Sequence, residues 1–98
     1  VYDPIEGAES VTLTAIDIDY KPARLSLIAG EPTNVTVVNE GETAHDFTLD
    51  EAEVHMNIEP GSEAETSVTV DEPGDYRAFC SVPGHEDAGM FVEVSVTE

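Results

Sequence analysis

The sequence predicts a single all-β domain of the sandwich type. Short runs rich in Val, Thr and Ile alternate with Gly, Pro and Asn along its 98 residues, as strands alternate with turns. Within most of these runs apolar residues recur at every second position, which indicates strands with one buried face. No segment shows helical periodicity. The length fits one domain around one core.

The first expected strand, residues 11–15, places its apolar side chains on one face. Ile16, Ile18 and Tyr20 continue the alternation with the opposite parity. This phase change predicts a bulge, or a strand that crosses from one sheet to the other. The next two strands are expected at residues 24–28 and 34–39.

The later strands are predicted from the same alternation. His45 shares its parity with Phe47 and Leu49, so it is expected to face the space between the sheets near a sheet end. Residues 51–57 are compatible with a short helical turn or an irregular strand. The other positions expected to face inward are Val35, Val37, Val68, Val70, Tyr76, Ala78, Cys80, Met90, Val92, Val94 and Val96.

A Pro-Gly-Asp-Tyr run at residues 73–76 resembles the tyrosine corner of Greek-key sandwiches. In that motif the tyrosine hydroxyl bonds back to nearby backbone. Tyr76 would then hold the start of the strand that delivers Cys80. A plain turn before a strand is the simpler interpretation, and the two are compatible.

Cys80, His85 and Met90 are separated by four residues each, and His45 lies upstream. Thiolate and thioether sulfur suit Cu(I), and imidazole suits both oxidation states of copper. Two His, one Cys and a weakly bound Met are the ligands of blue-copper electron-transfer sites. The sequence therefore predicts a metal site with these four ligands.

The segment between these residues has the turn chemistry that such a site needs. Pro83 and Gly84 supply a fixed φ followed by a permissive residue, which lets the chain return from Cys80 to His85. Gly89 allows a second bend before Met90.

Other potential ligands fit a metal site less well. His55 beside Met56 is the rival of His45 or a second metal site, although a surface His next to a core-facing Met explains the pair more simply. Four acidic residues lack the spacing and central Gly of an EF-hand and are expected to be solvated; they are Glu51, Glu53, Glu63 and Glu65.

From about residue 21 to residue 97 the chain resembles the cupredoxin family. The resemblance rests on the strand at 34–39, the His45-Asp46-Phe47 segment, residues 58–62, the Pro-Gly-Asp-Tyr run and the ligand loop. The loop spacing is similar to the auracyanin and sulfocyanin type. The resemblance implies a Greek-key β-sandwich and an electron carrier with one type 1 copper ion, bound by His45, Cys80, His85 and Met90.

The sequence departs from the family pattern at one position. Plastocyanin and azurin have Asn after the first His ligand, where it joins the two ligand loops, and this chain has Asp46. A carboxylate there could still bond to Ser81, and its charge would favour Cu(II) and lower the reduction potential. A backbone N–H near Asp46 is expected to bond to the Cys80 sulfur. His85 is expected to be the ligand nearest solvent, with Val82, Pro83 and Ala88 forming an apolar collar for transient docking of redox partners.

The number of potential ligands limits the alternatives to an electron carrier. An autonomous copper enzyme is not expected, because its further centres need more His than the one left over, and a binuclear centre needs a second Cys. The Met90 spacing argues against a catalytic Cys80. Zinc would require four strong ligands, and Met is a poor one. The serious alternative is a copper carrier, chaperone or storage module without a redox role, although Met is scarce here.

The charge balance is extreme. Three basic residues (Lys21, Arg24 and Arg77) face 22 acidic ones, for a formal net charge of −19. Such a domain repels itself at low ionic strength, and molar salt screens the repulsion. The composition resembles that of a protein from a salt-loving organism, and an acidic cupredoxin of this kind resembles halocyanin. Simple solubility and a docking face for a basic partner remain alternatives. Without a basic patch, no nucleic-acid binding is expected.

The organisation of the chain is expected to be simple. Residues 1–9 are interpreted as a linker or loose first segment and residues 10–98 as the domain. The chain begins with Val1, which is compatible with a processed domain and with attachment to a membrane through a segment outside this chain. No apolar run is long enough to cross a bilayer. We expect an extracytoplasmic monomer in which the lone Cys80 has no disulfide partner.

Salt adaptation predicts that this domain is more stable in concentrated salt. Raising KCl from about 0.01 M to 1 M shortens the Debye length from about 30 Å to 3 Å. The unfolding temperature should rise, because repulsion among the acidic side chains is screened. Thermal unfolding followed by circular dichroism measures it, and identical midpoints in the two solutions would contradict salt adaptation.

Overall fold

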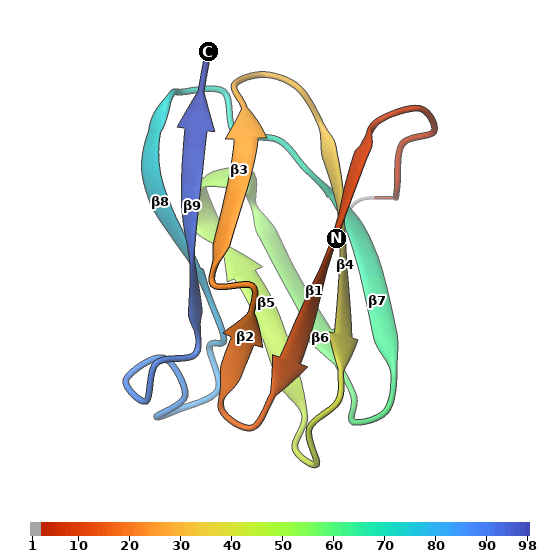
Figure 1. Ribbon diagram of the computed structural model, residues 1–98, viewed down its shortest axis with the longest axis vertical. Helices are drawn as coiled ribbons and strands as arrows, with labels where there is room; N and C mark the ends of the chain where they lie inside the picture. Colours follow the sequence, from red (N-terminus) through yellow and green to blue (C-terminus); the bar gives the residue numbers. More distant parts are fainter. Residues whose placement is uncertain (1–2) are drawn as a thin grey trace.

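The computed structural model, which describes residues 3–98, is a sandwich of two β-sheets (Figure 1). One sheet has the order β2-β1-β4-β7 and the other the order β3-β9-β8-β5-β6. Most neighbours are antiparallel, but β1 pairs with β4 and β3 with β9 in parallel. The elements are β1 (Glu9–Ile16), β2 (Asp19–Lys21), β3 (Arg24–Ile28), β4 (Thr33–Asn39), β5 (His45–Leu49), the 3-10 turn η1 (Asp50–Ala52), β6 (Val54–Ile58), β7 (Glu63–Val68), β8 (Gly74–Phe79) and β9 (Phe91–Thr97).

The predicted all-β class and the sandwich are confirmed. Residues 3–98 contain no α-helix, and none of their helical segments has the length and hydropathy needed to span a membrane. The core fills the space between the sheets. It includes the predicted inward-facing residues Val35, Val37, Phe47, Leu49, Val68, Val70, Ala78, Cys80, Met90, Val92, Val94 and Val96.

The prediction of a bulge or a crossing strand after residue 15 is wrong. The chain instead turns at Asp17 and Ile18, and β2 returns antiparallel to β1 in the same sheet, with Ile16 opposite Asp19. The parity changes because the turn interrupts the strand. Ile18 is 41% exposed at the tip of this hairpin, whereas Tyr20 is buried. Ile18 in the turn extended the alternation of apolar residues, which therefore resembled that of a continuing strand.

The helical turn expected within residues 51–57 is present, whereas the strand there is regular and not irregular. The 3-10 turn η1 covers Asp50–Ala52, and the regular strand β6 begins at Val54. Glu53 joins the two with a φ of 55°. Met56 is buried and its neighbour His55 is exposed, as alternation along β6 requires.

The tyrosine corner is present. Tyr76 is half-buried on β8, and its hydroxyl donates a 2.8 Å hydrogen bond to the Glu72 carbonyl. Gly74 between them has a φ of 152°, a value that favours glycine. The bond fixes the start of the strand that ends next to Cys80.

Two hydrogen bonds join the N-terminal segment to β4. Asn34 on β4 accepts a hydrogen bond from the Ile5 N–H and donates one to the Ile5 carbonyl. The strand β1 begins at Glu9, the last residue of the expected linker. Residues 1 and 2 of that linker lie outside the described residues.

Asn39 organises the loop between β4 and β5. It is 1% exposed, and its side-chain amide donates to the carbonyls of Thr43 and Ile58, at 2.9 Å each. The amide oxygen accepts from the Gly41 N–H. One buried side chain thus holds both sides of this loop against β6 and sets the path of the chain that enters β5 at His45.

Replacing Asn39 by Ala should destabilise the domain by about 1–3 kcal/mol, because buried backbone groups lose their partners. Urea unfolding measures the change. Asn57→Ala, on the exposed face of β6, is the matched control and should change stability by less than about 0.5 kcal/mol. Equal losses for the two variants would show that the Asn39 bonds contribute nothing beyond strand propensity.

Candidate metal centre

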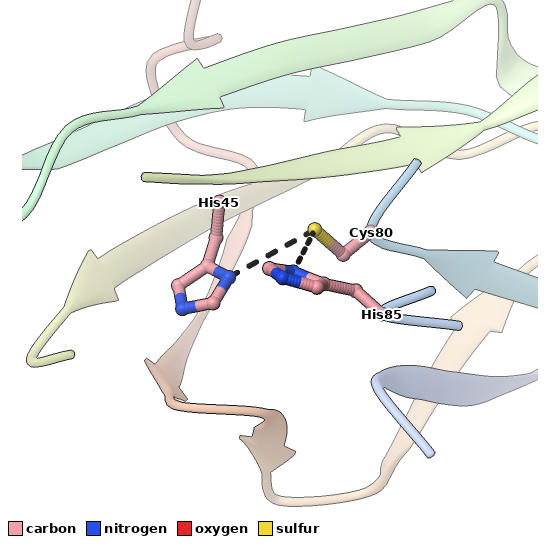
Figure 2. Close-up of side chains that lie close together, drawn as sticks. All are labelled: His45, Cys80 and His85. Atoms are coloured by element: carbon pink, nitrogen blue, oxygen red, sulfur yellow. Dashed lines mark hydrogen bonds between the residues drawn. The ribbon is translucent and has the colours of Figure 1, made fainter. Parts of the chain in front are cut away.

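Three of the predicted ligand residues converge at the end of the sandwich where the β1–β2, β4–β5 and β8–β9 connections gather (Figure 1). His45 opens β5, Cys80 directly follows β8, and His85 lies in the connection to β9. One ligand atom from each lies within 4.8 Å of the others. The Cys80 sulfur is 3.9 Å from His45 Nδ1 and 3.4 Å from His85 Nδ1 (Figure 2). The thiol and both δ nitrogens therefore face one small space.

The turn predicted at Pro83 and Gly84 brings His85 back to Cys80. The His85 N–H donates to the Val82 carbonyl at 3.0 Å, which closes a four-residue turn. Gly84, the third residue of this turn, has a φ of 83°. A positive φ at that position favours glycine, because a Cβ would be strained there. A continuing β-strand would have carried position 85 away from the thiol.

Met90 is fully buried at the end of the same loop. Its carbonyl accepts a 3.1 Å bond from the Cys80 N–H, and its own N–H donates to the His85 carbonyl at 3.0 Å. These bonds tie the backbone of Met90 to that of both other residues. Gly89 has a φ of 109° and provides the bend expected before Met90.

The two imidazoles differ in their exposure to solvent. His45 is 1% exposed, whereas His85 is half-buried at the edge of the loop. The rings are tilted by 53°, with centroids 5.1 Å apart. Of the residues expected to form a collar around His85, Val82 is half-buried, and Pro83 and Ala88 are exposed.

The Cys80 sulfur is buried beside the imidazoles of His45 and His85. Burial is the largest influence and raises the pKa of the Cys80 thiol, while the N–H groups of Asp46 and Val82 act in the opposite direction. The Asp46 N–H donates to the sulfur at 3.4 Å, so the predicted backbone bond is confirmed. In the metal-free protein the thiol is the favoured form at neutral pH.

The predicted bond between Asp46 and Ser81 is also confirmed. Asp46 is 3% exposed, and its carboxylate accepts hydrogen bonds from the Ser81 N–H at 2.8 Å and the Ser81 hydroxyl at 2.6 Å. The Thr48 hydroxyl donates a third bond at 3.0 Å. Three donors balance the loss of water around this buried carboxylate.

Tyr20 supports the same segment from the other sheet. Its buried hydroxyl donates a hydrogen bond to the Asp46 carbonyl, and its ring meets Phe47 edge to face. Burial, with Cys80 and Asp46 nearby, raises the pKa of Tyr20, so its phenol remains a hydrogen-bond donor.

Asp17 contacts the site, although sequence reasoning did not identify it. Its Oδ1 lies 2.8 Å from His45 Nε2, on the side of the ring away from Cys80. The change of parity around Ile16 marked a break in the strand near this residue. No local pattern connects Asp17 with a histidine in the opposite sheet.

The other potential ligands predicted from the sequence lie elsewhere. His55 is exposed on β6 and does not belong to the cluster of His45, Cys80 and His85; its Nδ1 lies 3.0 Å from the Thr48 hydroxyl. The four acidic residues expected to be solvated are all exposed: Glu51, Glu53, Glu63 and Glu65.

The donor set fits copper. Sulfur donors suit Cu(I), and imidazole suits both oxidation states. A structural zinc site takes four strong ligands, and a thioether is not one of them. The arrangement of His45, Cys80, His85 and Met90 is typical of a type 1 copper site.

Comparison with known sequences agrees with this chemistry. The family model for the cupredoxin-like domain matches residues 3–92. Among curated proteins, the copper-resistant cuproprotein CopI of Pseudomonas aeruginosa is 21% identical in an alignment that covers 93% of this chain and 77% of CopI.

Solved structures show the same fold. Auracyanin B superposes with a TM-score of 0.82 at 18% identity, over 99% of this chain and 94% of that one. Auracyanin A, described as a "blue" copper protein from the green thermophilic photosynthetic bacterium Chloroflexus aurantiacus, gives a TM-score of 0.79 at 15% identity. That superposition covers 93% of this chain and 100% of the other. At these identities the likeness shows the fold alone.

The raised pKa of Cys80 predicts that copper binding releases about one proton at neutral pH, because the metal binds the thiolate. The release should disappear above the raised pKa, where the metal-free protein has already lost the proton. Calorimetric titration with Cu(I) in two buffers of different ionisation enthalpy counts the protons. Cys80→Ser should release none from this position, and an equal release from that variant would contradict the assignment.

Proposed function

This chain belongs to the cupredoxin-like domain family, and we propose that it is a single-domain electron carrier with one type 1 copper ion. The observation that carries the proposal is the buried cluster in which one thiol and two imidazole nitrogens lie within 4.8 Å of one another. A likeness in fold to a blue copper protein supports it. The bound copper would accept and release one electron by alternating between Cu(II) and Cu(I).

Each proposed ligand has a distinct part. Cys80 supplies the thiolate, whose bond to copper gives the intense colour of such sites. His45 and His85 would each supply Nδ1 on the same side of the sulfur, and Met90 would supply a weakly bound thioether. The bonds of Asp46 to Ser81 and of its N–H to Cys80 hold the pocket in shape.

Electrons would enter and leave through His85, the more exposed imidazole. Around it, Val82, Pro83 and Ala88 offer a small apolar contact, which suits brief docking with redox protein partners. Electron transfer requires only that the two proteins approach closely. A small contact therefore allows rapid separation after the transfer.

We propose a carrier and not an enzyme on the basis of the ligand count. The chain has three histidines and one cysteine, and the cluster uses all of them except His55. A second catalytic copper centre would need more ligands of this kind. Residues 10–98 would act as an extracytoplasmic monomer, with residues 1–9 as a linker. The charge of −19 would suit concentrated salt.

A copper carrier or storage protein without a redox role is the second candidate. It is favoured by the sequence match to a protein named as a copper-resistant cuproprotein. Carriage requires copper to exchange readily, whereas electron transfer requires one site that holds both oxidation states. The buried, multiply bonded pocket around Cys80 supports the second requirement.

The visible spectrum during titration with Cu(II) separates the two functions. A redox carrier should develop an intense blue or green band that bleaches with ascorbate and returns in air. Cys80→Ser should abolish that band, because no thiolate remains. A colourless protein that still binds Cu(I) would instead favour carriage or storage, and a Cys80→Ser variant that stays blue would contradict the role of Cys80.

Met90→Leu tests the axial position. Leu fills a similar buried volume without a sulfur donor, so copper should stay bound and its reduction potential should rise. Voltammetry of the two proteins measures the shift. Met56→Leu, in the core but outside the ligand set, is the control. A potential unchanged by Met90→Leu would show that Met90 is not an axial ligand.

A further inference from the structure

The contact between Asp17 and His45 joins the two sheets at the metal centre. Asp17 lies in the turn between β1 and β2, and His45 opens β5 in the opposite sheet. The His45 side chain is fully buried, whereas that of Asp17 is 36% exposed. The carboxylate thus reaches from the surface to the Nε2 atom of a buried imidazole.

The geometry divides the two nitrogens of His45 between two partners. Nδ1 faces the Cys80 sulfur at 3.9 Å, and Nε2 faces Asp17 Oδ1 at 2.8 Å. A neutral imidazole carries one N–H, and an ionised carboxylate can only accept a hydrogen bond. Asp17 therefore selects the tautomer with its proton on Nε2, which leaves the Nδ1 lone pair free for a metal.

The loop before His45 is shaped to hold this carboxylate. The Glu42 N–H donates to Asp17 Oδ2 at 3.0 Å. That bond is the largest cause of the lowered pKa of Asp17, followed by the contact with His45. Gly41 leaves the necessary space, because a Cβ at this position would collide with the Asp17 carboxylate. Loop and turn thus present an ionised acceptor in one orientation.

We propose that Asp17 is a positioning residue of the copper site, which orients His45 and shifts the bound metal towards Cu(II). The inference rests on the proposed copper-binding function. A carboxylate that accepts the second N–H of a ligand histidine increases the basicity of the ring. The more basic ring, with a negative charge behind it, stabilises Cu(II) more than Cu(I), and so lowers the reduction potential.

The first test concerns the ring itself and requires no metal. Nitrogen-15 NMR of the metal-free chain, at mildly alkaline pH where an ordinary imidazole is neutral, reports the tautomer of His45. We expect the proton on Nε2 in the native chain and a mixture of tautomers in Asp17→Ala. A ring with the same tautomer in both proteins would overturn the positioning role.

The second test measures the potential of the copper-loaded chain. Asp17→Asn should weaken Cu(II) binding by about 10- to 100-fold. Each factor of ten lost by Cu(II) alone raises a one-electron potential by about 59 mV. Glu40→Gln removes the same charge from an exposed position in the neighbouring loop and is the matched control. Equal potentials in these two variants would overturn the inference.

Gly41→Ala separates the contact from the charge. Its new Cβ displaces the Asp17 carboxylate but leaves the net charge unchanged, and the backbone of Gly41 does not have the positive φ that would itself strain an alanine. Its potential should rise as in Asp17→Asn. A shift in Asp17→Asn with none in Gly41→Ala would mean that Asp17 acts through its charge alone, which overturns the positioning role.

Failure of this inference differs from failure of the proposed function. A chain that binds no copper, yet needs Asp17 for the His45 tautomer, overturns the copper function and leaves the positioning of the ring intact. If the chain is blue and redox-active but its reduction potential does not change when Asp17 is replaced, only the role of Asp17 is overturned.

Discussion

The side chain of Asp46 joins the two segments that carry His45 and Cys80, and the site depends on this connection. Near the ligands, β5 and β8 pair at one position only, where Thr48 lies opposite Phe79. Continued in the same antiparallel register, that pair places Asp46 opposite Ser81. The carboxylate bonds to Ser81, and the Asp46 N–H to the Cys80 sulfur, take over from the missing backbone ladder. The sheet can therefore open enough for a metal without losing its alignment.

Local alternation was sufficient to predict most of the fold. The parity of Phe47 and Leu49 correctly turned His45 inward, and the run from Met90 to Val96 is buried at every second residue. Alternation did not predict the hairpin at Ile18, because residue type alone does not distinguish an exposed isoleucine in a tight turn from a buried one in a strand. Hydrophobicity alone does not distinguish the two.

For the metal centre, the loop residues could be predicted because three of them lie in one short segment with its own turn chemistry. The contacts that support them could not, since they join distant positions. Asp17 reaches His45 from another sheet, and Asn39 acts through the carbonyls of Thr43 and Ile58, which carry no side-chain signal. Asp46 was an exception, because the resemblance to cupredoxins, which have a loop-joining Asn directly after the first His ligand, suggested its bond to Ser81.

The parallel pairs that close the sandwich affect when the site can form. β1 lies beside β4, and β3 beside the last strand, β9, so both pairs join segments separated by intervening strands. Contacts between distant segments carry an entropic cost of loop closure and are associated with slow folding. His45 and Cys80 lie at the ends of adjacent strands of one sheet, but the contact of His45 with Asp17 forms only when the two sheets face each other. We therefore expect copper to be acquired by the completed fold and not to nucleate its assembly.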